Sequence, residues 1–205
     1  LRFHGSACSL QHAVLNVKVF LENCGKPGAN SGESFARLPK VLAHGVDHLV
    51  VFLGMNDAMN SRKLVDVEGF RKNLTAITAA AGKAAVKSVL LLTIHPVNAE
   101  YLGERHPRHP QKQRLQAHLA EYDDAIREVA KETGSILVDW RTRFLAESPG
   151  ASIEEAVENR EDCLFRCAAN SGTRDGNHLT SEGYRFLADE VAKALRVPEE
   201  GKRSR

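Results

Sequence analysis

Short apolar runs that contain almost no polar residue recur along this chain, and segments with a helical pattern separate them. The runs cover residues 17–21, 48–53, 88–94 and 136–138. Such a run predicts a strand buried on both faces, because a strand with one face in water alternates apolar and polar residues. Apolar residues recur at helical spacing in the segments 34–44, 67–86, 115–133 and 181–195. Strands that alternate with helices in this way predict an α/β fold built on a parallel sheet.

Two polar stretches interrupt this alternation, at residues 98–114 and 147–174. Both follow the ends of expected strands, so we interpret both as loops over the functional face of the sheet. The second is interpreted as a lid-like insertion that contains a short helix over residues 152–159. A chain of 205 residues has the length of one domain. We therefore expect a single domain over residues 1–198, followed by a basic tail at 199–205.

The composition is that of an ordinary globular protein, with 42% apolar and 26% charged residues. The net charge is only +2, whereas a nucleic-acid-binding domain shows a strong basic excess or a basic stripe. No apolar run approaches the roughly 20 residues that span a bilayer. We therefore expect neither a nucleic-acid partner nor a membrane span. No signal peptide is recognisable and the first residues already resemble part of a strand, so secretion and a cytoplasmic location both stay open, as does the oligomeric state.

The chain has four cysteines, which are Cys8, Cys24, Cys163 and Cys167. Four cysteines in a chain of this length are too few to build a disulfide scaffold. The pair Cys163 and Cys167 lacks a second pair at the spacing of a zinc finger. In an exported protein these two residues could form a disulfide, and free thiols are the alternative.

Histidines in and near the first polar stretch raise the question of a metal site. His106 and His109 stand in a stretch that two prolines interrupt, and His95 follows the third apolar run. No H-E-x-x-H pattern or carboxylate triad accompanies them, so we expect no metal ion there. His106, with Arg105 and Arg108, could instead line the mouth of a substrate site.

An aspartate and a histidine three residues apart, Asp175 and His178, stand directly before the last expected helix. One turn of chain can bring them together, so that the carboxylate holds the Nδ1–H of the imidazole and Nε2 acts as a base. Taken alone, the pair also fits a surface turn with a capping aspartate and an incidental histidine.

Two further loops follow expected strands and carry residues suited to an oxyanion site. Gly54, Asn56 and Asp57 follow the second apolar run, where the Asn56 amide can donate to a developing negative charge and Asp57 can cap the next segment. Gly25 and Gly28, after the first run, permit close approach of the backbone to a ligand. Neither loop is a nucleotide-binding fingerprint, and each taken alone also fits an ordinary turn.

In this order and context, Gly28, Asn56, Asp175 and His178 resemble the signature of the SGNH hydrolase superfamily, which includes the GDSL-type esterases, lipases and acylhydrolases. The resemblance covers nearly the whole chain, and Thr93-Ile94-His95-Pro96 at the end of the third apolar run also resembles the family. It implies a flavodoxin-like α/β/α sandwich with about five parallel strands, and ester hydrolysis through an acyl-serine without a cofactor. It also implies that His178 is the base and Asp175 its orienting acid. The Gly28 backbone N–H and the Asn56 amide would then form the oxyanion hole.

The nucleophile block departs from the family, whose pattern is a strand followed by Gly-Asp-Ser. With Gly5 as the glycine of that block, Ala7 stands at the serine position. A shift by one residue makes Ser6 the nucleophile but places His4 where the glycine belongs. Ser6 as nucleophile and alanine at position 7, natural or engineered, both remain open. Ser34 approximates a nucleophile elbow, but it lacks the preceding strand and is interpreted as a helix-start serine.

The expected activity is hydrolysis of short acyl or acetyl esters, with carbohydrate esters as a candidate substrate. Polar insertions over the functional face favour a polar leaving group. One alternative is an acyltransferase that uses the same site. The other alternative is a non-catalytic flavodoxin-like binding module, which alanine at the nucleophile position would favour.

Overall fold

The computed structural model describes residues 20–147, 169–170 and 173–196. A parallel sheet lies at its centre, with strands in the order β1-β2-β3. The strands are β1 (His48–Val51), β2 (Ser88–Leu92) and β3 (Ile136–Val138). The parallel α/β fold is therefore confirmed, with three parallel strands among the described residues where about five were expected. Of the run 17–21, Phe20 and Leu21 form no strand, and residues 17–19 lie outside the described part.

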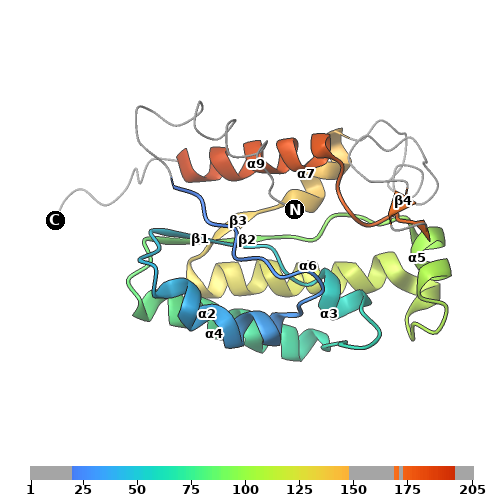
Figure 1. The fold of residues 1–205 in the computed structure, drawn as a ribbon, viewed down its shortest axis with the longest axis horizontal. Coiled ribbons are helices and arrows are strands. Elements are labelled where there is room, and N and C mark those ends of the chain that lie inside the picture. Colours follow the sequence, from blue (N-terminus) through green and yellow to red (C-terminus); the bar gives the residue numbers. More distant parts are fainter. Residues whose placement is uncertain (1–19, 148–168, 171–172, 197–205) are drawn as a thin grey trace.

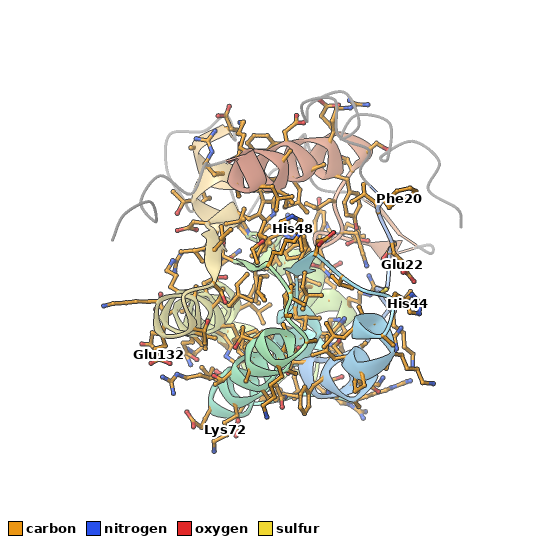
Figure 2. All side chains as sticks on the ribbon, turned by 90° about the vertical axis from the view of Figure 1, so that its left-hand side faces the viewer. Phe20, Glu22, His44, His48, Lys72 and Glu132 are labelled. Atoms are coloured by element: carbon orange, nitrogen blue, oxygen red, sulfur yellow. The ribbon has the colours of Figure 1, made fainter. Side chains whose placement is uncertain are left out.

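Helices cover both faces of the sheet, which gives the three-layer sandwich seen in Figure 1. One layer contains α2 (Ser31–Leu42), α3 (Met55–Met59), α4 (Val67–Lys83) and α6 (Leu115–Thr133). The other contains α7 (Trp140–Glu147) and α9 (Ser181–Arg196). Charged side chains of α4 and α6, such as Lys72 and Glu132, point outward in the side-chain view (Figure 2).

The middle strand explains why the apolar runs do not alternate. On β2, Leu91 belongs to the core beneath α4 and α6, whereas Leu90 and Leu92 belong to the core beneath α7 and α9. All three side chains are at most 2% exposed. Successive residues of a strand point to opposite faces, so a strand covered on both sides must be apolar at every position.

Local signals set the helix ends. Asn30 caps α2 with a reciprocal capping box to Glu33, so this helix begins at Ser31, earlier than the expected residue 34. The bounds expected for α6 agree with the structure, and the helix ends at Gly134, which adopts the left-handed conformation with φ 67°. The segment 67–86 forms a helix only as far as Lys83.

The first polar stretch is not a loop throughout, which corrects our interpretation. Its first half forms α5 (Ala99–Arg105), and a single turn of 3-10 helix, η1 (Lys112–Arg114), precedes α6. The Asn98 side chain caps α5 by accepting the Tyr101 N–H at 3.0 Å. Tyr101 and Leu102 are buried, and these contacts outweigh the polar composition of the segment.

Of the second polar stretch, the structure describes a short antiparallel pair, β4 (Ala169–Asn170) and β5 (Thr173–Arg174). The helix expected over 152–159, most of the lid-like insertion and the tail at 199–205 lie outside the described residues. The single domain over 1–198 therefore stays a prediction. No helix of the described part is long and apolar enough to cross a membrane.

Candidate active site

The site residues gather where the strands end. Parallel strands present their carboxyl ends at one edge of the sheet, and loops at that edge form the sites of open α/β folds. The loop after β1 leads into α3, the segment after β2 leads into α5, and β5 leads into the turn with Asp175 and His178. Figure 1 shows α3, α5 and β4 at the same end of the molecule.

The structure brings Asp175 and His178 into direct contact. Asp175 Oδ2 lies 2.7 Å from His178 Nδ1. Its other oxygen accepts the backbone N–H of Asn177 at 2.8 Å and that of His178 at 2.7 Å. The carboxyl side chain is 0% exposed, whereas the imidazole is 50% exposed. A buried acid thus orients a half-exposed imidazole, the geometry that the D-x-x-H spacing predicts.

The charge on Asp175 is stabilised in spite of its burial. Burial on its own would raise the pKa of this carboxyl. The hydrogen bonds from the two backbone N–H groups and from the His178 ring outweigh it, so the pKa of Asp175 lies below its usual value. The Arg105 guanidinium lies 4.0 Å from Oδ2. At neutral pH the acid is therefore ionised and can hold a proton on Nδ1 of His178.

Close packing against the start of α5 fixes the shape of this turn. Gly176 adopts φ +65°, and a Cβ at this position would lie 2.8 Å from Asn98 Cβ and 3.0 Å from Tyr101 Cβ. Arg174, just before the turn, stacks over the Tyr101 ring with its guanidinium carbon 4.0 Å from the ring centroid. It also pairs with Glu104 of α5. Both contacts fasten the turn to α5.

The two candidate oxyanion donors lie beside each other. Asn56 Nδ2 donates to the backbone carbonyl of Ala29 at 2.9 Å, next to Gly28. One N–H of an amide makes this bond, and the second can serve another acceptor. Gly28 adopts φ +71°, and no atom lies within 4 Å of the position of its absent Cβ. Loops that are 27 residues apart in sequence thus place both groups on one side of the site.

Gly54 makes this arrangement possible at the end of β1. It adopts φ +111°, a conformation that side chains rarely permit. A Cβ there would lie 2.8 Å from Ile94 Cδ1 and 3.0 Å from Phe70 Cζ. The chain therefore turns sharply over the core, and Asn56 follows in the first turn of α3.

Asp57 does not cap the segment that follows it, which corrects our expectation. Its wholly buried carboxyl accepts the backbone N–H of Ser31 at 3.0 Å and the Ser31 hydroxyl at 2.5 Å. Asn73 Nδ2 in turn donates to Ser31 Oγ at 2.8 Å. Burial raises the pKa of Asp57, and the Ser31 donors only partly oppose it. Asp57 therefore connects α3 to the start of α2, directly behind Gly28 and Asn56.

The model of the GDSL-like Lipase/Acylhydrolase family matches residues 5–186. The chain belongs to this family. Membership places the chain among the serine ester hydrolases, as the sequence predicted. No curated protein matches the chain significantly.

Solved structures of two esterases and a lipase/acylhydrolase share the fold. An acetyl xylan esterase, AlAXEase, is 24% identical with a TM-score of 0.65, and the match covers 84% of this chain and 79% of that one. A lipase/acylhydrolase from Enterococcus faecalis is 24% identical with a TM-score of 0.62 over 84% and 73% of the two chains. Axe2, an acetylxylan esterase from Geobacillus stearothermophilus, is 17% identical with a TM-score of 0.58 over 82% and 68%.

The nucleophile block of the GDSL family falls outside the described residues, so Ser6 and Ala7 both stay predictions. The cysteines 8, 163 and 167 also lie outside, whereas Cys24 is a free thiol whose pKa burial raises. The competing Ser34 lies in the first turn of α2, where its hydroxyl donates to the Asn30 carbonyl at 2.8 Å. It is a helix-start serine, as we predicted because no strand precedes it in the sequence.

His109, in the segment before α6, serves the fold. Buried His109 shares a hydrogen bond of 2.8 Å between Nε2 and the Ala58 carbonyl of α3, and its Nδ1 accepts the Gln111 N–H at 3.1 Å. Burial lowers the pKa of His109 and also that of His106. Among the residues that the structure describes, no cluster of three histidine, cysteine or acidic side chains could hold a metal ion.

Sequence reasoning missed three contacts that hold the site together: Asp57 to Ser31, His109 to Ala58, and His95 to the turn of Asp175 and His178. Each joins segments that are distant along the chain. The sequence signals for His95 were its position directly after an apolar strand, at the edge of the sheet where sites form, and the likeness of residues 93–96 to the SGNH family.

Proposed function

We propose that the chain hydrolyses short acyl esters, acetyl esters of carbohydrates above all, through an acyl-serine intermediate. The contact of 2.7 Å between buried Asp175 and His178 Nδ1 is the observation that carries this proposal. An ionised, buried carboxylate fixes the tautomer of the imidazole, so that Nε2 is the nitrogen that can accept a proton. The pair of Gly28 and Asn56 supplies the matching donors for negative charge.

In the first half-reaction, His178 Nε2 takes the proton of the serine hydroxyl, and the serine Oγ attacks the ester carbonyl carbon. The carbonyl oxygen becomes an oxyanion, which accepts hydrogen bonds from the Gly28 N–H and the Asn56 amide. The bond to the leaving alcohol then breaks, and the alcohol takes the proton from His178. Water repeats the sequence on the acyl-serine, releasing the acid and restoring the serine.

Two observations support a small acyl group on a polar alcohol. AlAXEase and Axe2, which share the fold, are acetyl xylan esterases. The C-terminal end of α5 also brings a cation to the site, since Arg105 lies 4.0 Å from Asp175 and its side chain is 31% exposed. Arg105, with His106 and Arg108, would line the mouth and favour a hydrated leaving group.

The position of the nucleophile decides whether the unsubstituted chain can turn over an ester substrate. We place the serine of the family at position 7, where this chain has alanine, and keep Ser6 as the alternative. In the first case Ala7→Ser creates or strongly raises hydrolysis, because base and oxyanion donors are already in place. Without the nucleophile, a serine hydrolase site can still retain a residual ~10³-fold acceleration over water, so faint activity in the parent agrees with this placement.

The test combines 4-nitrophenyl acetate hydrolysis with labelling by a fluorophosphonate, on the parent, Ala7→Ser and Ser6→Ala. A large gain from Ala7→Ser, with the label on residue 7 and little change from Ser6→Ala, supports position 7. Robust parent activity that Ser6→Ala abolishes assigns the nucleophile to Ser6. The proposal is contradicted if none of the three proteins hydrolyses esters from acetyl to butyryl and none takes the label. That result favours a non-catalytic binding module. Faster turnover when an alcohol is added would instead indicate acyl transfer.

A further inference from the structure

The segment between β2 and α5 holds the turn of Asp175 and His178 at two points. The backbone N–H of Asn98 donates to the Gly176 carbonyl at 2.8 Å. His95 Nε2 lies 2.5 Å from the Asn177 carbonyl oxygen. These are the carbonyls of the two residues between the acid and the base.

Each of the two peptide groups is therefore held at both ends. The peptide between Gly176 and Asn177 gives its oxygen to Asn98 and its N–H to Asp175. The next peptide gives its oxygen, that of Asn177, to His95 and its N–H, that of His178, to Asp175. Because a peptide group is planar, fixing its oxygen also fixes the direction of its N–H. The bond from His95 thus sets the direction in which the His178 N–H meets the carboxylate.

The surroundings of His95 suit a fixed donor. The residue is 5% exposed, and its ring stacks on Phe144 at 26° with the centroids 6.0 Å apart. Phe52 contacts the same ring at a centroid distance of 6.0 Å. A backbone carbonyl only accepts, so the proton of this hydrogen bond belongs to Nε2 of His95.

We propose that His95 is a positioning residue for the acid–base pair, acting through the Asn177 carbonyl. The role in catalysis rests on the proposed function. The His178 ring is half-exposed, so burial alone does not fix it, and the contact with Asp175 and the backbone of the turn help to hold it. A displacement of about 1 Å at a catalytic group can lower the rate by roughly 10²-fold.

The test replaces His95 in three ways. His95→Phe keeps an aromatic ring between Phe52 and Phe144 but removes the donor, and His95→Leu removes both. His95→Gln keeps an N–H at a similar reach. As a control, Ile126→Ala opens a cavity in the core on the opposite face of the sheet, where Ile126 is 1% exposed.

Two quantities are measured. The first is amide hydrogen exchange at Asn177 and His178 by NMR, which needs no activity. The second is kcat and KM for 4-nitrophenyl acetate in whichever form, parent or Ala7→Ser, hydrolyses it. We expect faster exchange at both amides in the Phe and Leu variants, and a kcat lowered by about 10–100-fold with KM changed by less than a few-fold. His95→Gln restores most of both, and Ile126→Ala changes neither beyond its loss of global stability.

If only one of the Phe and Leu variants folds, that variant suffices. Faster exchange at Asn177 and His178 without esterase activity in any form would end the proposed function and leave the positioning role standing. Unchanged exchange in a folded variant that lacks the donor overturns the inference. So does a loss of kcat that His95→Gln does not rescue.

Discussion

Asp57 and Asp175 are both 0% exposed aspartates at the same edge of the sheet, yet their pKa values shift in opposite directions. Asp57 meets the N–H and hydroxyl of Ser31, which are neutral donors, and burial raises its pKa. Asp175 meets two backbone N–H groups and an imidazole, and these donors lower its pKa in spite of burial.

The difference shows that burial does not by itself decide the charge of an acid. What decides the direction is the balance between the loss of water, which weighs more at the deeper Asp57, and the donors and imidazole charge that stabilise the Asp175 carboxylate. Asp175 is provided with enough donors to stay ionised, which is what an acid that orients a base requires. Asp57 carries out a different task, since it ties the loop of Asn56 to the start of α2 beside Gly28. In the mechanism we propose, Asp175 serves the chemistry directly, and Asp57 holds the loop of the Asn56 oxyanion donor in place.

The largest effect is expected from removing the base. His178→Ala should lower kcat/KM for 4-nitrophenyl acetate by at least roughly 10³-fold in the active form of the chain. The melting temperature should change little, because the His178 side chain is half-exposed. Activity within a few-fold of the unsubstituted form would show that Asp175 and His178 take no part in the mechanism. Asp175 and Asp57 would then no longer differ in function.

The oxyanion side should give the next largest effect. Asn56→Ala removes one donor, which is expected to lower kcat by roughly 10²-fold while leaving the protein folded. Steady-state kinetics and thermal melting of the same sample separate the two effects. A collapse in melting temperature with full activity in the remaining folded protein would make Asn56 a structural residue.

The smallest effects concern stability against pH, and here the two aspartates should have opposite signs. The raised pKa of Asp57 means that its ionisation costs stability, so its contribution falls as pH rises through its folded pKa. Asp57→Asn should therefore lose less stability than the parent on going from pH 4 to pH 7. The lowered pKa of Asp175 stabilises the fold above the ordinary pKa of an aspartate, and this is lost as pH falls through the lower folded value.

Urea unfolding at several pH values checks these signs, with each variant compared to the parent. Burial raises the pKa of Asp123 to about 7, so its ionisation also lowers stability as pH rises, in the parent and in both variants. The informative quantity is therefore the difference in unfolding free energy between each variant and the parent at the same pH. Asp175→Asn should cost stability at pH 7 and progressively less below pH 4. Identical pH profiles for the two variants would contradict the comparison.

Local patterns predicted the elements that local physics determines. The bounds of α6 follow from apolar spacing and from the glycine that ends it, and the contact of Asp175 with His178 follows from a spacing of three residues. The helix α5 was missed because its segment is polar and contains prolines nearby. Its capping asparagine and its burial against the turn of Asp175 stabilise it instead.

Long-range contacts could not be predicted in this way. Asn56 meets Ala29 across 27 residues, and His95 meets Asn177 across 82. Nothing in either segment specifies its distant partner, because the register of the sheet and the packing of the loops create the contact. The resemblance to the SGNH family implied that Asn56 and Gly28 act together and included the segments of Asp57 and His95, but it did not indicate the partners that these two residues contact.

The most direct test of the account compares Asp175→Asn with Asp57→Asn, each assayed for kcat and for unfolding free energy at pH 7. Asparagine at 175 cannot hold the Nδ1 proton of His178 as a carboxylate does, so kcat should fall by roughly 10²-fold or more, though less than for His178→Ala. Asparagine at 57 keeps an oxygen that can accept the Ser31 N–H and hydroxyl and lies away from the acid–base pair, so kcat should stay within a few-fold. A loss of kcat in Asp57→Asn as large as that in Asp175→Asn would contradict the division of roles, as would full activity in Asp175→Asn.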